Sequence, residues 1–332
     1  GAVISAGEAG LVGLVAPQVS NAGTIQANLG TIILAGGVTA YTLDMYGDGL
    51  VNLAVTGQIG AGAVGADAVL VNTQKTGKLL APGGRIQLSA QAADGVVNKL
   101  INADGQISAQ AKNGKSGSIS IQGIGGDITI AGDLLANGAD ATPGGAIEVT
   151  ASKGAVLAQT SSTLDTTGGP MGGTISLTSH KAAHLAGKIT TQGYITLNAD
   201  APITNTGLIN ANTVEVNSGT TLTLSATGQI SDTTAVSADG TLDISGANSP
   251  VSLSGLGGSG TVALGGQRLI VDTTKAPDGS VSDGSVFTGN ITDGGLSGGV
   301  GGGLTIAGGT QLLMGQNTYT GTTVVNEGAT LS

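Results

Sequence analysis

The only two histidines of the chain stand four residues apart, in the segment His180-Lys-Ala-Ala-His184. On a helix this spacing can hold a metal ion, but the zinc-protease motif needs a glutamate after its first histidine, and Lys181 stands there. On a strand the two rings would be about 13 Å apart, which is too far to chelate one ion. We therefore expect surface histidines and no metal site.

A second candidate for chemistry is the segment Tyr41-Thr-Leu-Asp-Met-Tyr-Gly-Asp-Gly49. Asp44 and Asp48 flank Tyr46, and two carboxylates about 5–9 Å apart suit glycoside hydrolysis. Tyrosine rings can also stack on sugars. The alternative interpretation is an aromatic-anchored turn with a bend at Asp48-Gly49.

Three other motifs do not fit known sites. Gly125-Gly-Asp127 is isolated and departs from the tandem calcium-binding pattern. Gly114-Lys-Ser116 ends like a phosphate-binding loop, but Ala109 replaces the upstream glycine and the next segment resembles a strand. Asn290-Ile-Thr292 is a glycosylation triplet of a kind that arises by chance in threonine-rich chains. We expect no catalytic, cofactor-binding or metal-binding residues, no cofactor and no enzyme.

Charge and composition exclude several classes of protein. The net charge of −10 opposes binding to nucleic acid through a general basic surface. The 61 glycines accompany only 7 prolines, which excludes collagen, and the absence of cysteine excludes disulfides. Residues 70–120 hold six of the eleven basic residues, which we interpret as a solvated surface (Lys75, Lys78, Arg85, Lys99, Lys112, Lys115).

The elements that must position these residues follow from one repeated template: glycine, any residue, aliphatic, any residue, aliphatic, any residue, small. A strand of this kind cannot bury its single apolar face alone, so neighbouring copies must stack. The pattern predicts an all-β parallel solenoid. The copies are Gly30–Gly36, Gly84–Ala90, Gly117–Gly123, Gly126–Gly132, Gly145–Ala151, Gly173–Ser179, Gly193–Ala199, Gly240–Gly246 and Gly260–Gly266.

The spacing of the template predicts the shape of one coil. Glycines 117, 145 and 173 are two steps of 28 residues apart, and other steps shorten to about 20. One step accommodates strands at Ala146–Ala151, Ala155–Gln159 and Thr163–Thr167, with glycines at the corners. Three strands per coil predict a β-helix of roughly triangular cross-section with three parallel sheets.

Asparagine recurs where corners are expected, as at Asn21-Ala-Gly23 and Asn205-Thr-Gly207, and stacked amides could form ladders. The segment Gly294–Gly303 holds seven glycines and fits a flexible hinge, a glycine-lined corner or an irregular coil. Thr220–Thr223, Thr273-Thr274 and Thr318–Thr323 are candidates for an ice-binding face, although their rows are irregular.

Two parts of the chain resemble known families. Val15–Ile25, continuing through Gly30–Gly37, resembles the filamentous haemagglutinin family of secreted adhesins. Gly315–Leu331, with its Asn-Thr-Tyr-Thr-Gly core, and Gly240–Val271 resemble the passenger repeats of autotransporters. The resemblance implies a right-handed parallel β-helix exported from a Gram-negative cell through an outer-membrane translocator. It divides one continuous solenoid into a haemagglutinin-like part, residues 1–240, and a passenger-like part, residues 241–332.

From these patterns we expect a non-enzymatic, extracellular β-helix in a surface fibre, adhesin shaft or matrix filament. Its expected partners are other copies stacked end to end or a longer parent chain, and glycans of a host or neighbouring cell. The alternatives are a polysaccharide-active enzyme and a β-helix that binds carbohydrate or ice. No segment has the length of a membrane-spanning helix.

Overall fold

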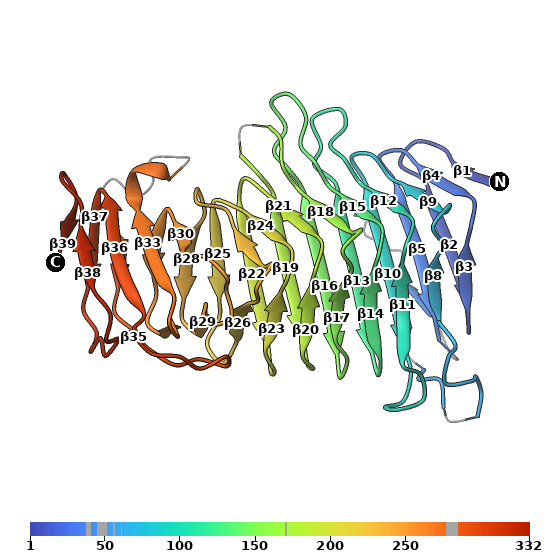
Figure 1. Cartoon of the computed structure of the whole chain (residues 1–332). Helices are drawn as coiled ribbons and strands as arrows, with labels where there is room; N and C mark the ends of the chain where they lie inside the picture. The colour runs from blue at the N-terminus through green and yellow to red at the C-terminus, as the bar shows by residue number, and fades with distance from the viewer. Residues whose placement is uncertain (38–40, 45–51, 56, 61, 170, 277–284) are drawn as a thin grey trace. The chain divides into compact units, whose positions relative to one another are not determined.

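The computed structural model describes residues 1–37, 41–44, 52–55, 57–60, 62–169, 171–276 and 285–332, with only the backbone of 41–44 and 52–55. The described part is built from strands and one 3₁₀ turn, η1 (Thr273–Lys275). Three long sheets are entirely parallel, and their strands recur at every third place in the chain, as Figure 1 shows. The predicted parallel β-helix of three sheets is confirmed. The chain divides into two compact units, residues 1–173 with 178–181 and residues 174–177 with 182–332.

In the first unit each coil contributes one strand to each sheet. The first sheet contains β1 (Val3–Ala6), β4 (Thr24–Ala27), β9 (Lys78–Leu80), β12 (Gln106–Ser108), β15 (Asp133–Leu135) and β18 (Thr163–Asp165). The second contains β2 (Leu11–Ala16), β5 (Thr31–Gly36), β10 (Arg85–Gln91), β13 (Ser118–Ile124) and β16 (Ala146–Ser152). The third contains β3 (Val19–Asn21), β8 (Val71–Thr73), β11 (Lys99–Ala103), β14 (Asp127–Ile130) and β17 (Val156–Ala158). Strand β19 (Thr174–Ser179) has residues in both units.

The second unit repeats this order and then changes it. The first sheet has β21 (Lys188–Thr190), β24 (Leu208–Asn210) and β27 (Gln229–Ile230), and the second has β22 (Tyr194–Ala199), β25 (Thr213–Val216), β28 (Ala235–Ala238) and β31 (Gly255–Gly257). The third has β20 (Ala183–Leu185), β23 (Ile203–Asn205), β26 (Thr221–Leu224), β29 (Thr241–Asp243), β32 (Thr261–Ala263) and β35 (Asn290–Thr292). A fourth sheet holds β30 (Val251–Leu253), β33 (Arg268–Asp272), β36 (Gly303–Gly308) and β38 (Thr323–Val325), and a fifth holds β34 (Ser285–Phe287), β37 (Thr310–Leu313) and β39 (Thr330–Leu331).

The core is a set of aliphatic columns that run from coil to coil. In the second sheet Ile32 pairs with Ile86, Ile86 with Ile119 and Ile119 with Ile147, and all four are at most 1% exposed. Ser118 pairs with Ala146, which confirms a coil of 28 residues, and Thr241 pairs with Thr261, which confirms one of 20. Inward-facing positions therefore keep their register although the corners differ in length.

The template glycines are explained by the close approach of successive corners. The carbonyl of Gly30 accepts the N–H of Arg85 at 2.9 Å, so the coils are tied together at this point. A Cβ atom on Gly84 would overlap that same Gly30 carbonyl oxygen. In the same way, a Cβ atom on Gly260 would overlap the carbonyl oxygen of Gly240. Glycine is needed at these corners because the neighbouring coil occupies the side-chain volume.

One hairpin departs from the parallel order. Strands β6 (Tyr41–Asp44) and β7 (Asn52–Val55) form the one antiparallel strand pair among the described strands. Strand β7 lies against β5 and β10. On the outward-facing side of β5, Ile33 and Ala35 are buried, and Val15 packs against them. An apolar patch on the outside of the second sheet therefore accompanies this hairpin.

Candidate functional site

The two histidines lie in strand β20 and in the turn that precedes it. His184 lies in β20 with its side chain exposed, and its Nε2 is 2.9 Å from the hydroxyl of Thr206. His180 lies in the turn before β20, where its backbone N–H donates to the carbonyls of Ala151 and Gly154. Among the described residues, no group of three or more histidine, cysteine or acidic side chains is placed to hold a metal ion.

The other motifs lie in structural elements. Tyr41 and Asp44 are the two ends of β6, whereas Tyr46 and Asp48 lie outside the described residues. Gly114–Ser116 belongs to a tight turn closed by a bridge between Lys112 and Lys115, and a strand follows it, as expected. The triplet Asn290–Thr292 is strand β35.

The basic residues of 70–120 do not gather on one sheet. Lys78, Arg85 and Lys99 are the first residues of β9, β10 and β11, which belong to three different sheets. Each of these side chains therefore leaves the coil from a different side.

The asparagine corners are confirmed, and their amides also connect coils. The side-chain Oδ1 of Asn205 accepts the N–H of Gly207 at 3.2 Å, and its Nδ2 donates to the carbonyl of Gln229 on the next coil at 3.1 Å. Amide ladders form as well: Asn102 donates to Asn72 at 2.9 Å, and Asn217 donates to Asn198 at 2.6 Å. The Asn205 side chain holds its corner, and the ladders, whose Asn72, Asn102 and Asn198 lie in strands, add coil-to-coil bonds.

Three threonines of the third sheet form a short row. Thr221, Thr241 and Thr261 pair in succession along the third sheet, and Asn290 takes the next place. In the neighbouring row, Thr223 is followed by Asp243 and Ala263, so this face does not present two threonines on every coil. Thr273 and Thr274 lie in η1, outside this sheet.

The glycine loop, residues 293–302, forms a corner that side chains of another coil fix by hydrogen bonds. Asp243 in β29 is 1% exposed, and its Oδ1 accepts both the N–H and the hydroxyl of Ser245. Its Oδ2 accepts the N–H of Leu296 at 2.6 Å, and the hydroxyl oxygen of Ser245 accepts the N–H of Ser297 at 3.0 Å. Of the structures expected for Gly294–Gly303, the glycine-lined corner is therefore the one observed.

A second carboxylate holds the other end of the glycine loop. Asp293 accepts the backbone N–H groups of Gly301 and Gly302 and the N–H and hydroxyl of Thr320. The Thr320 hydroxyl is the largest cause that lowers the pKa of Asp293 below its usual 3.8, the backbone donors add to it, and desolvation acts in the opposite direction. This carboxylate links the loop to the Asn-Thr-Tyr-Thr-Gly segment.

The loop held in this way displays apolar side chains. Leu296 is 65% exposed and Val300 is 79% exposed, and both lie between the two carboxylate anchors. Gly295 has a φ of +99°, and a Cβ there would meet Oδ1 of Asp243, so glycine is required where the loop crosses its anchor.

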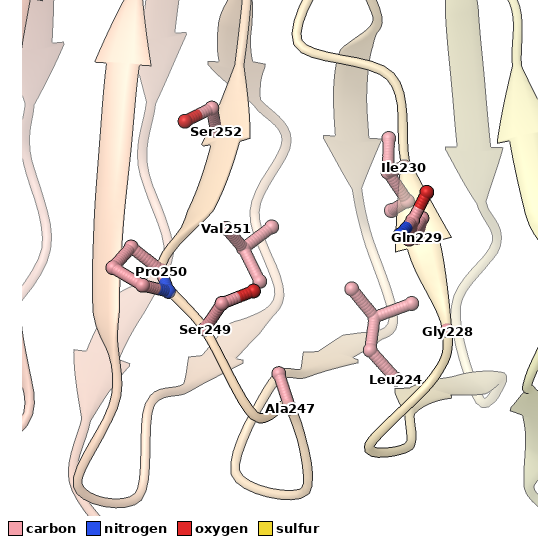
Figure 2. Close-up of a pocket in the computed structure, with 9 residues that line it drawn as sticks. All are labelled: Leu224, Gly228, Gln229, Ile230, Ala247, Ser249, Pro250, Val251 and Ser252. Carbon is pink, nitrogen blue, oxygen red and sulfur yellow. The ribbon is translucent and has the colours of Figure 1, made fainter.

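A notch opens where the first sheet stops and the fourth begins. Strand β27 is the last of the first sheet and β30 is the first of the fourth, and no backbone pairing joins them in the part of the chain that the structure describes. Figure 2 shows Ser249–Ser252 facing Gln229 and Ile230, with Leu224 and Ala247 at one end. The notch has a volume of about 190 Å³.

Proline contributes to this break. Pro250 stands immediately before β30, and a proline has no N–H to donate to the preceding coil. Coil pairing resumes at Ser254, whose N–H donates to the carbonyl of Thr234 at 2.9 Å. Beside the notch, Lys275 reaches Asp232 at 2.6 Å, which connects the turn after β27 with η1 after β33.

The sequence patterns did not single out Asp243, Asp293 or Pro250. Asp243 occupies a strand position that carries threonine or alanine on the paired coils. The acidic residue at this position could have indicated an unusual contact. Pro250 follows the turn-forming run Gly246–Ser249, which could have indicated an irregular coil.

Comparison with known proteins assigns the chain to no family. No family model, curated protein or solved structure matches this chain. Within the described residues, no helix has the length and apolar composition needed to cross a bilayer.

Proposed function

We propose that this chain is an extracellular structural and adhesive β-helix, a building segment of a cell-surface fibre, adhesin shaft or matrix filament. It acts mechanically, without a catalytic step, cofactor or bound nucleic acid. Its partners are further coils of the same kind, supplied by other copies end to end or by a longer parent chain, and glycans on a neighbouring or host cell.

The observation that supports this proposal most strongly is the constant register between coils. In the second sheet of the first unit, each coil offers the next the same ladder of backbone groups and the same aliphatic column, as from Ile32 to Ile147. A coil added from another chain would meet an equivalent surface, so the fold can be extended without a new interface. Parallel strand edges favour such pairing because their backbone donors and acceptors are unpaired.

The sequence resemblance gives further support. Residues 15–37 resemble the filamentous haemagglutinin family and residues 315–331 resemble autotransporter passenger repeats, which are both exported Gram-negative surface proteins, and the absence of cysteine suits folding outside the cell. We therefore propose an extracellular location reached through an outer-membrane translocator.

Electron microscopy of the purified chain over a range of concentrations tests this proposal. Threads whose average length increases with concentration are expected from end-to-end addition. Isolated particles at every concentration would contradict self-assembly by this chain.

The alternative is a polysaccharide-active β-helix, for which the Tyr41–Gly49 segment was the sequence candidate. Incubation with acidic and neutral polysaccharides, followed by separation of the products by size, distinguishes the two. Our proposal expects no shortening of the polymers, and cleavage that is lost in the Asp44→Asn variant would establish the enzyme instead.

A further inference from the structure

The outer face of the second sheet carries an exposed aromatic ring in the second unit. Tyr194 is the first residue of β22, and its side chain is 52% exposed. It alternates with Ile195 and Leu197, which are 0% exposed and point into the core, so the ring projects outward from the coil. The ring is not part of the repeat, because Thr213 and Ala235 take its place on the next two coils. A large apolar surface therefore stands open to solvent beside smaller side chains.

Two pairs of polar side chains lie on the same face. Thr196 and Asn198 follow Tyr194 at every second position of β22, so they share its side of the sheet. The Thr196 hydroxyl donates to Oε2 of Glu215 on the next coil at 2.9 Å. Nδ2 of Asn217, also on the next coil, donates to Oδ1 of Asn198 at 2.6 Å. These bonds fix the side chains before a ligand arrives, which lowers the entropy that binding costs.

Each pair keeps hydrogen-bonding capacity that the protein does not use. Oε1 of Glu215 can accept a hydrogen bond, Nδ2 of Asn198 can donate one and Oδ1 of Asn217 can accept one. None of these three atoms has a hydrogen-bond partner among the described residues, and none of them is buried. A ligand with several hydroxyl or amino groups would find both donors and acceptors here.

The charge of this face selects the sign of its ligand. Of the outward-facing residues of β22, β25 and β28, all of which the structure describes, Glu215 alone is charged. An anionic ligand would meet this carboxylate without a basic side chain from these strands to balance it. A protonated amine would gain a charge-assisted hydrogen bond at Oε1.

The ring and the carboxylate are close enough to contact one ligand unit. Tyr194 pairs in register with Thr213, and Glu215 lies two residues further along the same face. Diagonal neighbours of this kind are within reach of aromatic and long side chains. One sugar ring can thus place a carbon-bound face on Tyr194 and an amine on Glu215.

We propose that this face binds a saccharide chain that carries free amines, with one ring on Tyr194, its ammonium group on Glu215 and hydroxyls of the chain on Asn198 and Asn217. The inference rests on the proposed adhesive function, because it gives the glycan partner a chemical class and a place. An open sheet face suits a chain that extends over several coils. A lysine-rich peptide would supply the charge but would leave the two asparagine amides without hydroxyl partners.

Three tetrasaccharides that differ in one substituent test the proposal. The β-linked tetramers of glucosamine, N-acetylglucosamine and glucose carry an amine, an acetamide and a hydroxyl at the same ring carbon. The full chain with ¹³C-labelled tyrosine is titrated with each at a mildly acidic pH, at which glucosamine is protonated, and Tyr194→Phe identifies the Tyr194 ring signals. We expect saturable shifts of these signals, with binding of the glucosamine tetramer tighter than that of the other two by about fivefold.

Three results of these titrations would overturn the proposal. The first is the absence of Tyr194 shifts with the glucosamine tetramer. The second is binding of that tetramer no tighter than binding of the acetylated or the glucose tetramer. The third is binding of tetralysine as tight as that of the glucosamine tetramer, which would indicate a basic peptide as the partner.

Two matched glutamate variants locate the ammonium group. Glu215→Gln keeps an acceptor for the Thr196 hydroxyl and removes the charge. Glu148→Gln makes the same change on the outer face of β16, where Ser118 has the place that Tyr194 has beside Glu215. We expect Glu215→Gln to weaken binding of the glucosamine tetramer about fivefold and to leave the glucose tetramer unaffected. Glu148→Gln should change neither, and equal effects of the two variants would refute the site.

Replacement of the ring tests the stacking contact. Tyr194→Thr introduces the side chain that the next coil carries at this place, as Thr213. We expect it to weaken binding of all three tetrasaccharides, and unchanged affinities would overturn the role given to the ring. Thread formation, measured in the same samples, reports separately on the fibre. Threads without sugar binding would refute this inference alone, and sugar binding without threads would contradict self-assembly alone.

Discussion

At the scale of single residues, two carboxylates decide the conformation of the glycine loop. Asp243 is buried beneath the loop and accepts the Leu296 N–H, whereas Asp293 accepts donors from both sides of the loop's other end. A loop so rich in glycine loses much conformational entropy when it is ordered. Charge-assisted hydrogen bonds to backbone N–H groups offset that loss.

Removal of the buried carboxylate is expected to release the loop. In Asp243→Ala the N–H of Leu296 and the groups of Ser245 lose their acceptor, which we expect to destabilise the protein by about 1–3 kcal/mol. Chemical denaturation measures this loss, and limited proteolysis reports cleavage within 294–302. The matched control is Asp239→Ala. This variant removes an exposed carboxylate that also accepts hydrogen bonds from a neighbouring coil, namely from the N–H and the hydroxyl of Ser259. Equal stability losses in both variants would contradict the role given to burial.

Acid is expected to detach the other end of the loop. Because the pKa of Asp293 is lowered in the folded protein, its contribution is present above the unfolded value of about 3.8. The contribution is lost as the pH falls through the lowered pKa. We therefore expect the backbone N–H groups of Gly301, Gly302 and Thr320 to exchange more slowly at neutral pH than at acidic pH, after correction for intrinsic exchange rates. In Asp293→Asn this pH dependence should disappear, and its persistence would assign the transition to another group.

At the scale of elements, the sequence predicted the repeating parts of the fold and missed the exceptions. The predicted strand Ala146–Ala151 is found as β16, Ala146–Ser152, because glycine corners and alternating aliphatic residues recur within each coil. The β6–β7 hairpin, the break at Pro250 and the anchored glycine loop each occur once. Their structures depend on contacts with particular neighbouring coils, and a repeat pattern contains no record of such contacts.

The candidate sites show the same division. The asparagine corner at Asn205 was predictable because an Asx turn is local and carries its own signature. The burial of Asp243 was not, because it depends on a loop that follows some fifty residues later and covers β29. The notch results from the relation of β27 to β30, two strands of successive coils that fail to pair.

The template glycines give a prediction at this scale. In Gly84→Ala the new methyl group would overlap the Gly30 carbonyl, so we expect a loss of roughly 1–3 kcal/mol. Gly13→Ala is the control, since a Cβ at Gly13 in β2 meets nothing within 4 Å. The added methyl group lowers the conformational entropy of the unfolded chain, so we expect that variant to be as stable as the parent chain or slightly more stable. Denaturation midpoints that are equal in the two variants would show that close coil approach does not select glycine.

The end-to-end addition that we propose would use the outer edge of β1. The Thr24 N–H donates to the carbonyl of Ala2, so alternation points the backbone groups of Ser5 away from β4. Ser5→Pro removes an outward N–H and spares the inward bonds. We expect shorter threads or none in this variant and normal threads in Ser5→Ala, measured by sedimentation and electron microscopy. Threads of unchanged length in Ser5→Pro would show that this edge takes no part in assembly.

At the scale of the whole molecule, the stability of the chain comes from the repetition of its coils. Buried columns of Ile, Leu, Val and Ala run through the described coils of each unit, and backbone pairing joins successive coils except between β27 and β30. Features that are not repeated, namely the hairpin, the glycine loop and the notch, are placed on or between coils. We infer that the repeated part supplies mechanical strength and that the unrepeated features supply contacts with other molecules.

Immunogold electron microscopy of the cells that make this chain tests the central claim most directly. Antibodies raised against residues 1–332 are expected to label threads outside the cell, at intervals along their length. Gold confined to the cell interior, or found only on isolated particles, would contradict the proposal that the chain builds an extracellular fibre.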